Sequence, residues 1–246
     1  MIKLIDVSEW NGDLNLIEAA KDVQGIIIRA GYGKGHVDGY STANIQRAIA
    51  ANMPYMGVYW FSYAVSPEEA RREADECFNQ IRYFKDKINL PVFIDFEEDS
   101  INWMEKCRIY PTKELLKSIV AAFCDRITEL GLEAGYYSNY SNYRDYFDAD
   151  ELKKYKLWFA WWDEEEPPEI VNKAYLYQFT DKGYIRGCGG PVDVNFLLAP
   201  EEVKDKYYTV NDVVRGIWNG DFGNGEERKE NLYNYFQSKV NEGRPD

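Results

Sequence analysis

The sequence predicts an α/β protein built as an irregular eight-stranded β/α barrel, TIM-like in its general plan. Three observations support this prediction: eight short apolar runs recur up to Phe196, amphipathic helical patterns separate the first five of them, and the later connections are too short for full helices. Runs that are apolar throughout are typical of parallel strands buried on both faces. Strands alternating with helices favour a barrel, with a doubly wound open sheet as the alternative.

The strands and helices can be assigned in order along the chain. Strands are expected at residues 2–6, 25–30, 56–61, 91–97, 133–138, 157–161, 174–179 and 192–196. Helices are expected at residues 14–21, 41–52, 67–87 and 112–130. Ser66 before Pro67 is a typical helix start, and Gly131 is a typical helix end. Pro167-Pro168 forbids a helix before the seventh strand, so the second half of the barrel should have reduced helices.

The chain beyond the barrel shows a different pattern. We assign residues 1–199 to the catalytic barrel, 200–206 to a charged connector and 207–246 to a small helical segment. In that segment apolar residues such as Val210, Val214 and Trp218 recur at helical spacing. About 40 residues form a small core, so this segment is expected to lean on the barrel or on a partner molecule.

Composition excludes several classes of function. The net charge of −13, from 29 basic and 42 acidic residues, disfavours nucleic acid as a partner. A single histidine, His36, and four cysteines without C-x-x-C spacing disfavour a histidine-dependent triad and a zinc site, so no metal or cofactor is expected. No apolar stretch is long enough to span a membrane, and no signal peptide precedes Asp6. We therefore expect synthesis in the cytosol.

Acidic residues recur at the ends of predicted strands. Asp95 and Glu97 follow a buried run at positions i and i+2, which places both side chains on one side of the strand, about 7 Å apart along it. Asp6 ends the first strand and Asp193 lies in the eighth, its neighbour in a closed barrel. Acids that converge from several strands repel one another, so a stabilising role explains them poorly. The alternative is that they cap helices or pair with Arg29.

Such a cluster suits the hydrolysis of a glycosidic bond. Crowded carboxyl groups cannot all ionise, so one keeps its proton towards neutral pH beside an ionised partner. Aromatic residues make up 16% of the chain, including 20 tyrosines and 7 tryptophans, and aromatic rings with polar tips are suited to contact with sugars. Tyr63, Tyr137 and Trp161 lie at strand ends and are candidates for substrate binding.

Several segments together resemble a known family. They are R-A-G-Y-G at 29–33, Y-W-F-S-Y-A at 59–64, V-F-I-D-F-E-E at 92–98, L-W-F-A-W-W at 157–162 and V-D-V-N at 192–195. As a set they resemble glycoside hydrolase family 25, the lysozymes of the Chalaropsis type and of many phages. The resemblance implies an N-acetylmuramidase that cuts the β-1,4 bond between N-acetylmuramic acid and N-acetylglucosamine, with Glu97 as acid/base and Asp6, Asp95 and Asp193 as further catalytic residues. Arg29 and Tyr32 of the first motif join the substrate-binding candidates.

The resemblance extends to partner and setting. Residues 214–232 resemble the short cell-wall-binding repeat of some phage lysozymes, here in a single copy. Bacterial peptidoglycan is the implied partner, and an endolysin-like or extracellular action on the cell wall is the implied setting; the oligomeric state stays open. Hydrolysis assisted by the substrate's acetamido group, with retention, and direct attack by water, with inversion, both stay open. A non-catalytic glycan-binding protein and a chitinase-like glycosidase are the other functions considered.

Overall fold

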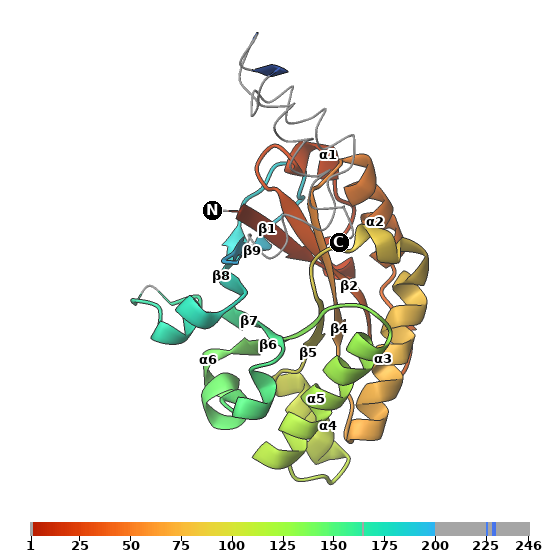
Figure 1. Ribbon diagram of the computed structural model, residues 1–246, viewed down its shortest axis with the longest axis vertical. Helices are drawn as coiled ribbons and strands as arrows, with labels where there is room; N and C mark the ends of the chain where they lie inside the picture. Colours follow the sequence, from red (N-terminus) through yellow and green to blue (C-terminus); the bar gives the residue numbers. More distant parts are fainter. Residues whose placement is uncertain (1, 164, 200–224, 226–227, 230–246) are drawn as a thin grey trace, which may run out of the picture. The chain divides into compact units, whose positions relative to one another are not determined.

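The computed structural model describes residues 2–163, 165–199, 225, 228 and 229, and its central feature is a closed barrel (Figure 1). The strands of the ring are β1 (Ile2–Val7), β2 (Gly25–Tyr32), β4 (Tyr55–Phe61), β5 (Val92–Asp95), β6 (Ala134–Asn139), β7 (Lys156–Ala160), β8 (Leu176–Gly183) and β9 (Val192–Leu197). They follow the order β1-β9-β8-β7-β6-β5-β4-β2, and parallel pairing of β1 with β2 closes the ring. Closure confirms the barrel over the open sheet.

One strand of the ring runs against the expected direction. β9 pairs antiparallel with both β1 and β8, so the expectation that the apolar runs form parallel strands does not hold for β9. The connection from β8 to β9, residues 184–191, is shorter than the dozen or so residues that a parallel crossover requires. A short strand, β3 (His36–Val37), which the sequence did not predict, pairs antiparallel with the end of β2.

Long helices are confined to the first part of the barrel (Figure 1). They are α2 (Ser41–Ala50), α3 (Pro67–Ile81), α4 (Glu98–Lys106) and α5 (Lys113–Glu129), whereas α1 (Leu16–Ala19) and α6 (Tyr140–Asn142) are single turns. Figure 1 shows α2, α3 and α5 along the outer side of β2, β4 and β5. Between β7 and β8 the described residues form only a short 3-10 turn, Glu169–Lys173, which confirms the expected reduction of helices in the second half.

The helix boundaries follow from local chemistry. The Ser66 side chain accepts the Glu69 N–H, and Thr112 caps α5 in the same way through Leu115 N–H. Gly131 follows α5 with φ +82°, a conformation that glycine adopts without strain, as the sequence predicted. The predicted helix at 67–87 is instead α3 followed by a 3-10 helix, Arg82–Lys87. The predicted helix at 14–21 shortens to α1, and α4 was not predicted.

Alternation along the strands divides the core into two layers. Inside the barrel pack Ile27, Tyr59, Phe93, Trp158 and Leu176. The residues between them face outwards, for example Ile26, Ile28, Val92 and Ile94, and pack against the helices. Because side chains alternate with period two, this parity turns Asp6, Arg29, Asp95 and Gln178 inwards at the ends of their strands. It therefore decides which polar side chains reach the mouth of the barrel.

The chain divides into two units, Met1–Val203 and Lys204–Asp246. The connector expected at 200–206 and the helical segment expected at 207–246 lie outside the described residues, apart from Gly225, Arg228 and Lys229. In the described part of the chain, no helix is both long and apolar enough to cross a membrane. The proposed domain boundaries stay predictions.

Candidate active site

Four carboxyl groups gather at one end of the barrel. Asp6, near the end of β1, lies directly opposite Asp193, near the start of β9, because these two strands run antiparallel. Asp95 is the last residue of β5, and Glu97 continues the extended chain with φ −116° and ψ −168°. Phe96 between them packs outwards in the core, so Asp95 and Glu97 share the inner side. The antiparallel direction of β9 thus brings an acid at the start of a strand to the ends of the others.

Two side-chain amides hold Asp6. Gln178 Nε2 and Asn195 Nδ2 both donate to Asp6 Oδ2, at 2.9 and 2.7 Å. All three side chains are buried, with exposures of 5% or less. Hydrogen bonds to an ionised carboxylate favour its charged form, so this pair of donors stabilises Asp6 as an anion inside the barrel.

The two amides are themselves fixed by aromatic donors. Gln178 Oε1 accepts the hydroxyl of Tyr137 and the indole N–H of Trp162, both at 3.1 Å. Asn195 Oδ1 accepts the indole N–H of Trp158 at 2.8 Å. With its oxygen accepting, each amide must present its nitrogen to Asp6, which fixes the orientation of both groups. Gln178, Asn195 and Trp162 were not among the predicted site residues.

Asp6 and Asp193 share one proton. Burial raises the pKa of Asp193 to about 8, and the charge of Asp6 and the hydrogen bond between the two groups add to it. Burial also raises the pKa of Asp6, against the opposing effect of the Asn195, Gln178 and Asp193 hydrogen bonds. The proton therefore resides on Asp193, which donates to ionised Asp6.

Asp95 and Glu97 form a second pair. Burial raises the pKa of Glu97 to about 7; its hydrogen bonds with Tyr137 and Asp95 oppose this, and the charges of Asp99 and Asp193 add to it. Burial, followed by the charges of Glu97 and Asp6, raises the pKa of Asp95 well above its usual range. Both are coupled through a shared hydrogen bond, so the pair keeps one proton near neutral pH. Asp95 Oδ1 is buried and has no hydrogen-bond partner among the described residues.

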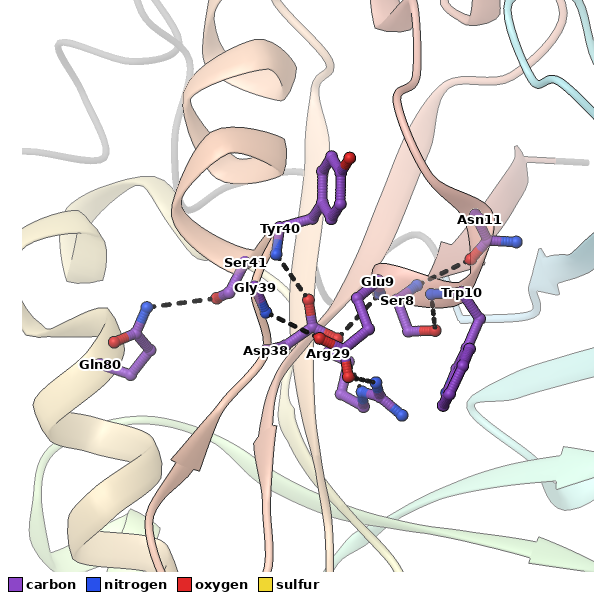
Figure 2. Close-up of polar contacts among 10 residues, drawn as sticks. All are labelled: Ser8, Glu9, Trp10, Asn11, Arg29, Asp38, Gly39, Tyr40, Ser41 and Gln80. Carbon is purple, nitrogen blue, oxygen red and sulfur yellow. Dashed lines mark hydrogen bonds and ion pairs between the residues drawn. The ribbon is translucent and has the colours of Figure 1, made fainter.

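Arg29 is committed to other acids (Figure 2). Its Nε donates to Asp38 at 2.8 Å and its Nη2 donates to Glu9 at 2.9 Å. Asp38 also accepts the backbone N–H groups of Glu9 and Tyr40, both at 2.9 Å. The four carboxyl groups at the mouth are therefore not pairing partners of Arg29, although its positive charge opposes the rise in the pKa of Asp95.

The candidates Tyr32 and Tyr63 are half-buried and lie near Arg29. Tyr32 stacks on His36, with ring centroids 5.2 Å apart, and its ring centroid lies 5.3 Å from Arg29 Cζ. Tyr63 lies edge-to-face with Trp103 on α4, with centroids 6.0 Å apart. The Tyr63 N–H donates at 3.0 Å to Glu73, a buried residue of α3 that fixes the loop after β4.

Tyr137 and Trp161 differ in their exposure. Tyr137 is 5% exposed inside the barrel, so it offers little surface to a sugar and instead contacts Gln178 and Glu97. Trp161 is half-buried, packs edge-to-face on Tyr140 at 5.3 Å between ring centroids, and donates to the Glu165 carbonyl at 3.4 Å. Trp162 beside it is 51% exposed. The inward parity of β8 and β9 is the signal that could have found Gln178 and Asn195.

A barrel that gathers proton-sharing carboxyl pairs at its mouth has the arrangement expected of a glycoside hydrolase. Within the described residues, no group of three or more His, Cys, Asp or Glu side chains is arranged to hold a metal ion. The chain belongs to glycosyl hydrolases family 25, whose sequence model matches residues 5–188.

Solved structures of similar fold come from bacteria and phages. The modular autolysin LytC of Streptococcus pneumoniae, in complex with a synthetic peptidoglycan ligand, is 26% identical with a TM-score of 0.66, over 79% of this chain and 46% of that one. The catalytic domain of endolysin ply40 from bacteriophage P40 of Listeria monocytogenes is 20% identical, with a TM-score of 0.68, over 83% of this chain and 96% of that one.

A bacterial lysozyme from Streptomyces coelicolor is 20% identical, with a TM-score of 0.67, over 84% of this chain and 98% of that one. No curated protein sequence matches the chain significantly. This chain thus spans less than half the length of the modular autolysin and nearly the whole of the two shorter structures.

Proposed function

We propose that this protein is an N-acetylmuramidase that hydrolyses the β-1,4 bond between N-acetylmuramic acid and N-acetylglucosamine in bacterial peptidoglycan. Membership of family 25 and the likeness to an autolysin described in complex with a peptidoglycan ligand support this substrate. The observation that carries the proposal is the Asp95–Glu97 pair, which keeps a proton near neutral pH at the mouth of the barrel. A proton-holding acid beside an ionised partner is what cleavage of a glycosidic bond needs.

Glu97 is proposed as the general acid, since it is the more exposed member of the pair. It donates its proton to the glycosidic oxygen as the bond to the anomeric carbon breaks. The oxygen of the substrate's own acetamido group attacks that carbon, and Asp95 orients and polarises this group. Ionised Glu97 then takes a proton from a water molecule as the water oxygen attacks the anomeric carbon. This attack opens the cyclic intermediate, and the overall course is retention.

The hydrogen bond between Asp95 and Glu97 favours this course over inversion by the same two residues. An inverting pair needs a separation of about 6.5–9.5 Å to hold the attacking water between its carboxyl groups. NMR of the first-formed product distinguishes the two courses: an initial β-anomer is expected, and an initial α-anomer would eliminate assistance by the acetamido group.

Mass spectrometry of the fragments released from defined peptidoglycan tests the bond that is cut. Products with N-acetylmuramic acid at the reducing end are expected. Reducing-end N-acetylglucosamine would contradict the proposal. Release of fragments from chitin but not from peptidoglycan would favour the chitinase-like alternative, and binding without any release would favour the glycan-binding alternative.

A further inference from the structure

Tyr137 lies between the two pairs of carboxyl groups. It is directly opposite Asp95 in the β5–β6 ladder, and its buried ring packs edge-to-face on Trp158, with ring centroids 4.9 Å apart. The hydroxyl donates to Gln178 Oε1 at 3.1 Å and also hydrogen-bonds with Glu97. One hydroxyl group therefore contacts both the proposed general acid and an amide of the other pair.

The direction of the Tyr137–Gln178 hydrogen bond follows from counting hydrogens. Burial, followed by the charge of Glu97, raises the pKa of Tyr137 well above its usual range, so the phenol keeps its single hydrogen. Gln178 Nε2 faces Asp6, and Gln178 Oε1 faces the indole N–H of Trp162, which can only donate. The hydrogen of Tyr137 is therefore used on Gln178, and its oxygen offers only lone pairs to Glu97.

This arrangement suits a protonated Glu97 and conflicts with an ionised one. A protonated carboxyl group can donate to the Tyr137 oxygen, whereas a carboxylate there would face lone pairs and lack a donor. Rotation of the hydroxyl about its C–O bond removes the conflict, because it brings the hydrogen to Glu97. Gln178 Oε1 then still accepts the Trp162 N–H at 3.1 Å, so the amide keeps its orientation towards Asp6.

Carboxyl groups from four elements act on Glu97. Asp95 hydrogen-bonds with it, and negative charge on the others opposes its ionisation. The positive charge of Arg29, on β2, acts on Asp95. A hydrogen-bond donor is therefore what an ionised Glu97 needs most. The four acids are Asp95 on β5, Asp99 on α4, Asp193 on β9 and Asp6 on β1.

We propose that Tyr137 is a positioning residue whose hydroxyl turns with the protonation state of Glu97. It donates to Gln178 while Glu97 holds its proton, and to the Glu97 carboxylate once that proton has moved to the glycosidic oxygen. Tyr137 keeps its own proton throughout, and the hydroxyl returns to Gln178 when Glu97 takes a proton from water. This inference rests on the proposed function, because it concerns the partner of the general acid.

The first test follows the titration of Glu97 without substrate, by NMR of the full chain isotope-labelled at the glutamate carboxyl carbons. The Glu97 signal is the one missing from the Glu97→Gln protein. Tyr137→Phe should raise the midpoint by about one pH unit, because the carboxylate loses a donor. A hydroxyl fixed on Gln178 would only accept from Glu97, and its loss would lower the midpoint. A midpoint that falls or stays in place overturns the proposal.

Tyr136→Phe is the matched control for the loss of a buried hydroxyl. Tyr136 precedes Tyr137 on β6 but faces outwards, where its ring packs against Phe147 with ring centroids 6.0 Å apart. This variant should leave the Glu97 midpoint unchanged.

A second variant tests the rotation through a residue that acts on Glu97 only by way of Gln178 and Tyr137. Trp162→Phe removes the N–H that stays on Gln178 Oε1 when the hydroxyl turns away. Turning then leaves this oxygen without a donor, so the Glu97 midpoint should rise by about half a pH unit. The same substitution in the Tyr137→Phe background should change nothing. An equal effect in both backgrounds, or no effect in either, overturns the proposal.

The pH profile of cleavage separates this role from a merely structural one. On peptidoglycan, Tyr137→Phe should move the alkaline limb of kcat/KM upwards by the same amount and lower kcat about three- to tenfold. KM and the acidic limb should stay unchanged, because Gln178 still holds Asp6. A loss of activity without movement of the alkaline limb contradicts the proposal.

The two proposals can fail separately, because the NMR titration does not depend on turnover. The expected shifts in a chain whose wild type cleaves no glycan would remove the enzymatic function and keep the rotating hydroxyl. Cleavage of peptidoglycan with an unshifted Glu97 midpoint in Tyr137→Phe would keep the enzymatic function and remove the role of Tyr137.

Discussion

Asp6 and Asp193 lie opposite each other in the β1–β9 ladder and share a hydrogen bond, so the first and last strands of the barrel meet at a pair of acids. A buried and a half-buried carboxyl group in contact would repel each other if both were ionised. One proton on Asp193 and two amide donors on Asp6 remove that conflict. This pair therefore carries one negative charge, on Asp6, and one proton, on Asp193, and it lies next to the Asp95–Glu97 pair.

Glu97→Gln should remove the general acid. We expect kcat on purified peptidoglycan to fall by about 100- to 10,000-fold, because an amide N–H is far too weakly acidic to protonate the leaving oxygen. Glu98→Gln, at an exposed neighbouring position, is the control and should retain activity. Release of reducing ends is the measurement, and near-normal turnover by Glu97→Gln would remove Glu97 from the proposed role.

Activity should decline as the pH rises through about 7, where Glu97 loses its proton. The pH profile of kcat/KM reports this loss in the free enzyme. A rate that stays constant from pH 6 to pH 9 would contradict the assignment of a proton-holding Glu97.

Asp193→Asn should make the free energy of unfolding less dependent on pH. The pKa of Asp193 is raised to about 8 in the folded protein, above its value of about 3.9 in the unfolded chain, so the folded protein binds this proton more tightly. The resulting stabilisation is fully present below about pH 4 and is lost as the pH rises through about 8. Urea unfolding at several pH values is the measurement, with exposed Glu105→Gln as the control.

Gln178→Met should shift the pH dependence of activity. Loss of the Nε2 donor removes one of the hydrogen bonds that lower the pKa of Asp6, so the acidic limb of the pH profile should move to higher pH. The variant should also lose about 1–3 kcal/mol of stability, because the Tyr137 and Trp162 donors lose their acceptor. Trp162→Phe keeps the amide in contact with Asp6 and should leave the acidic limb in place. An unshifted limb in Gln178→Met would contradict this role.

Arg29→Met should destabilise the fold by about 3 kcal/mol or more, because it leaves the Asp38 carboxylate buried without its guanidinium partner. Urea unfolding measures the loss. A double variant with Asp38→Asn removes the buried charge as well and should recover part of the stability. If the loss of stability in the double variant equals the sum of the losses in the two single variants, Arg29 and Asp38 are not coupled.

Activity on intact walls should increase from very low to moderate ionic strength. The chain carries a net charge of −13, and walls rich in anionic polymer should repel it until salt screens the charges. Turbidity clearing across a salt series is the measurement, with short soluble oligosaccharides as the control that should show a weaker dependence. Activity that falls steadily from the lowest salt concentration would contradict the expectation.

Much of the barrel could be predicted because its strands are short apolar runs whose side chains alternate. The same period places Asp95 and Glu97 on one side, and the structure brings both to the mouth. The direction of β9 could not be read from its apolar pattern, since hydrophobicity does not distinguish parallel from antiparallel pairing. The length of the connection before it carries that information.

Other features depend on tertiary contacts that a single sequence does not display. Helix α4 begins immediately after Glu97, with Glu98 and Asp99 in its first turn, whereas no helix is expected from the sequence between residues 97 and 112. The hydrogen bonds of Gln178 and Asn195 join strands far apart in the chain. A sequence motif of charged residues does not indicate these neutral amides, although they influence the protonation state of the acids.

The pairing of β9 with β1 also bears on when the site forms during synthesis. Asp6 lies on the first strand of the barrel, whereas its contacts with Gln178, Asp193 and Asn195 require almost the whole barrel. Contacts of such long sequence separation form late in folding. A nascent chain that stops before β9 has an open ring and an incomplete acid cluster, so a ribosome-bound fragment should have no hydrolase activity.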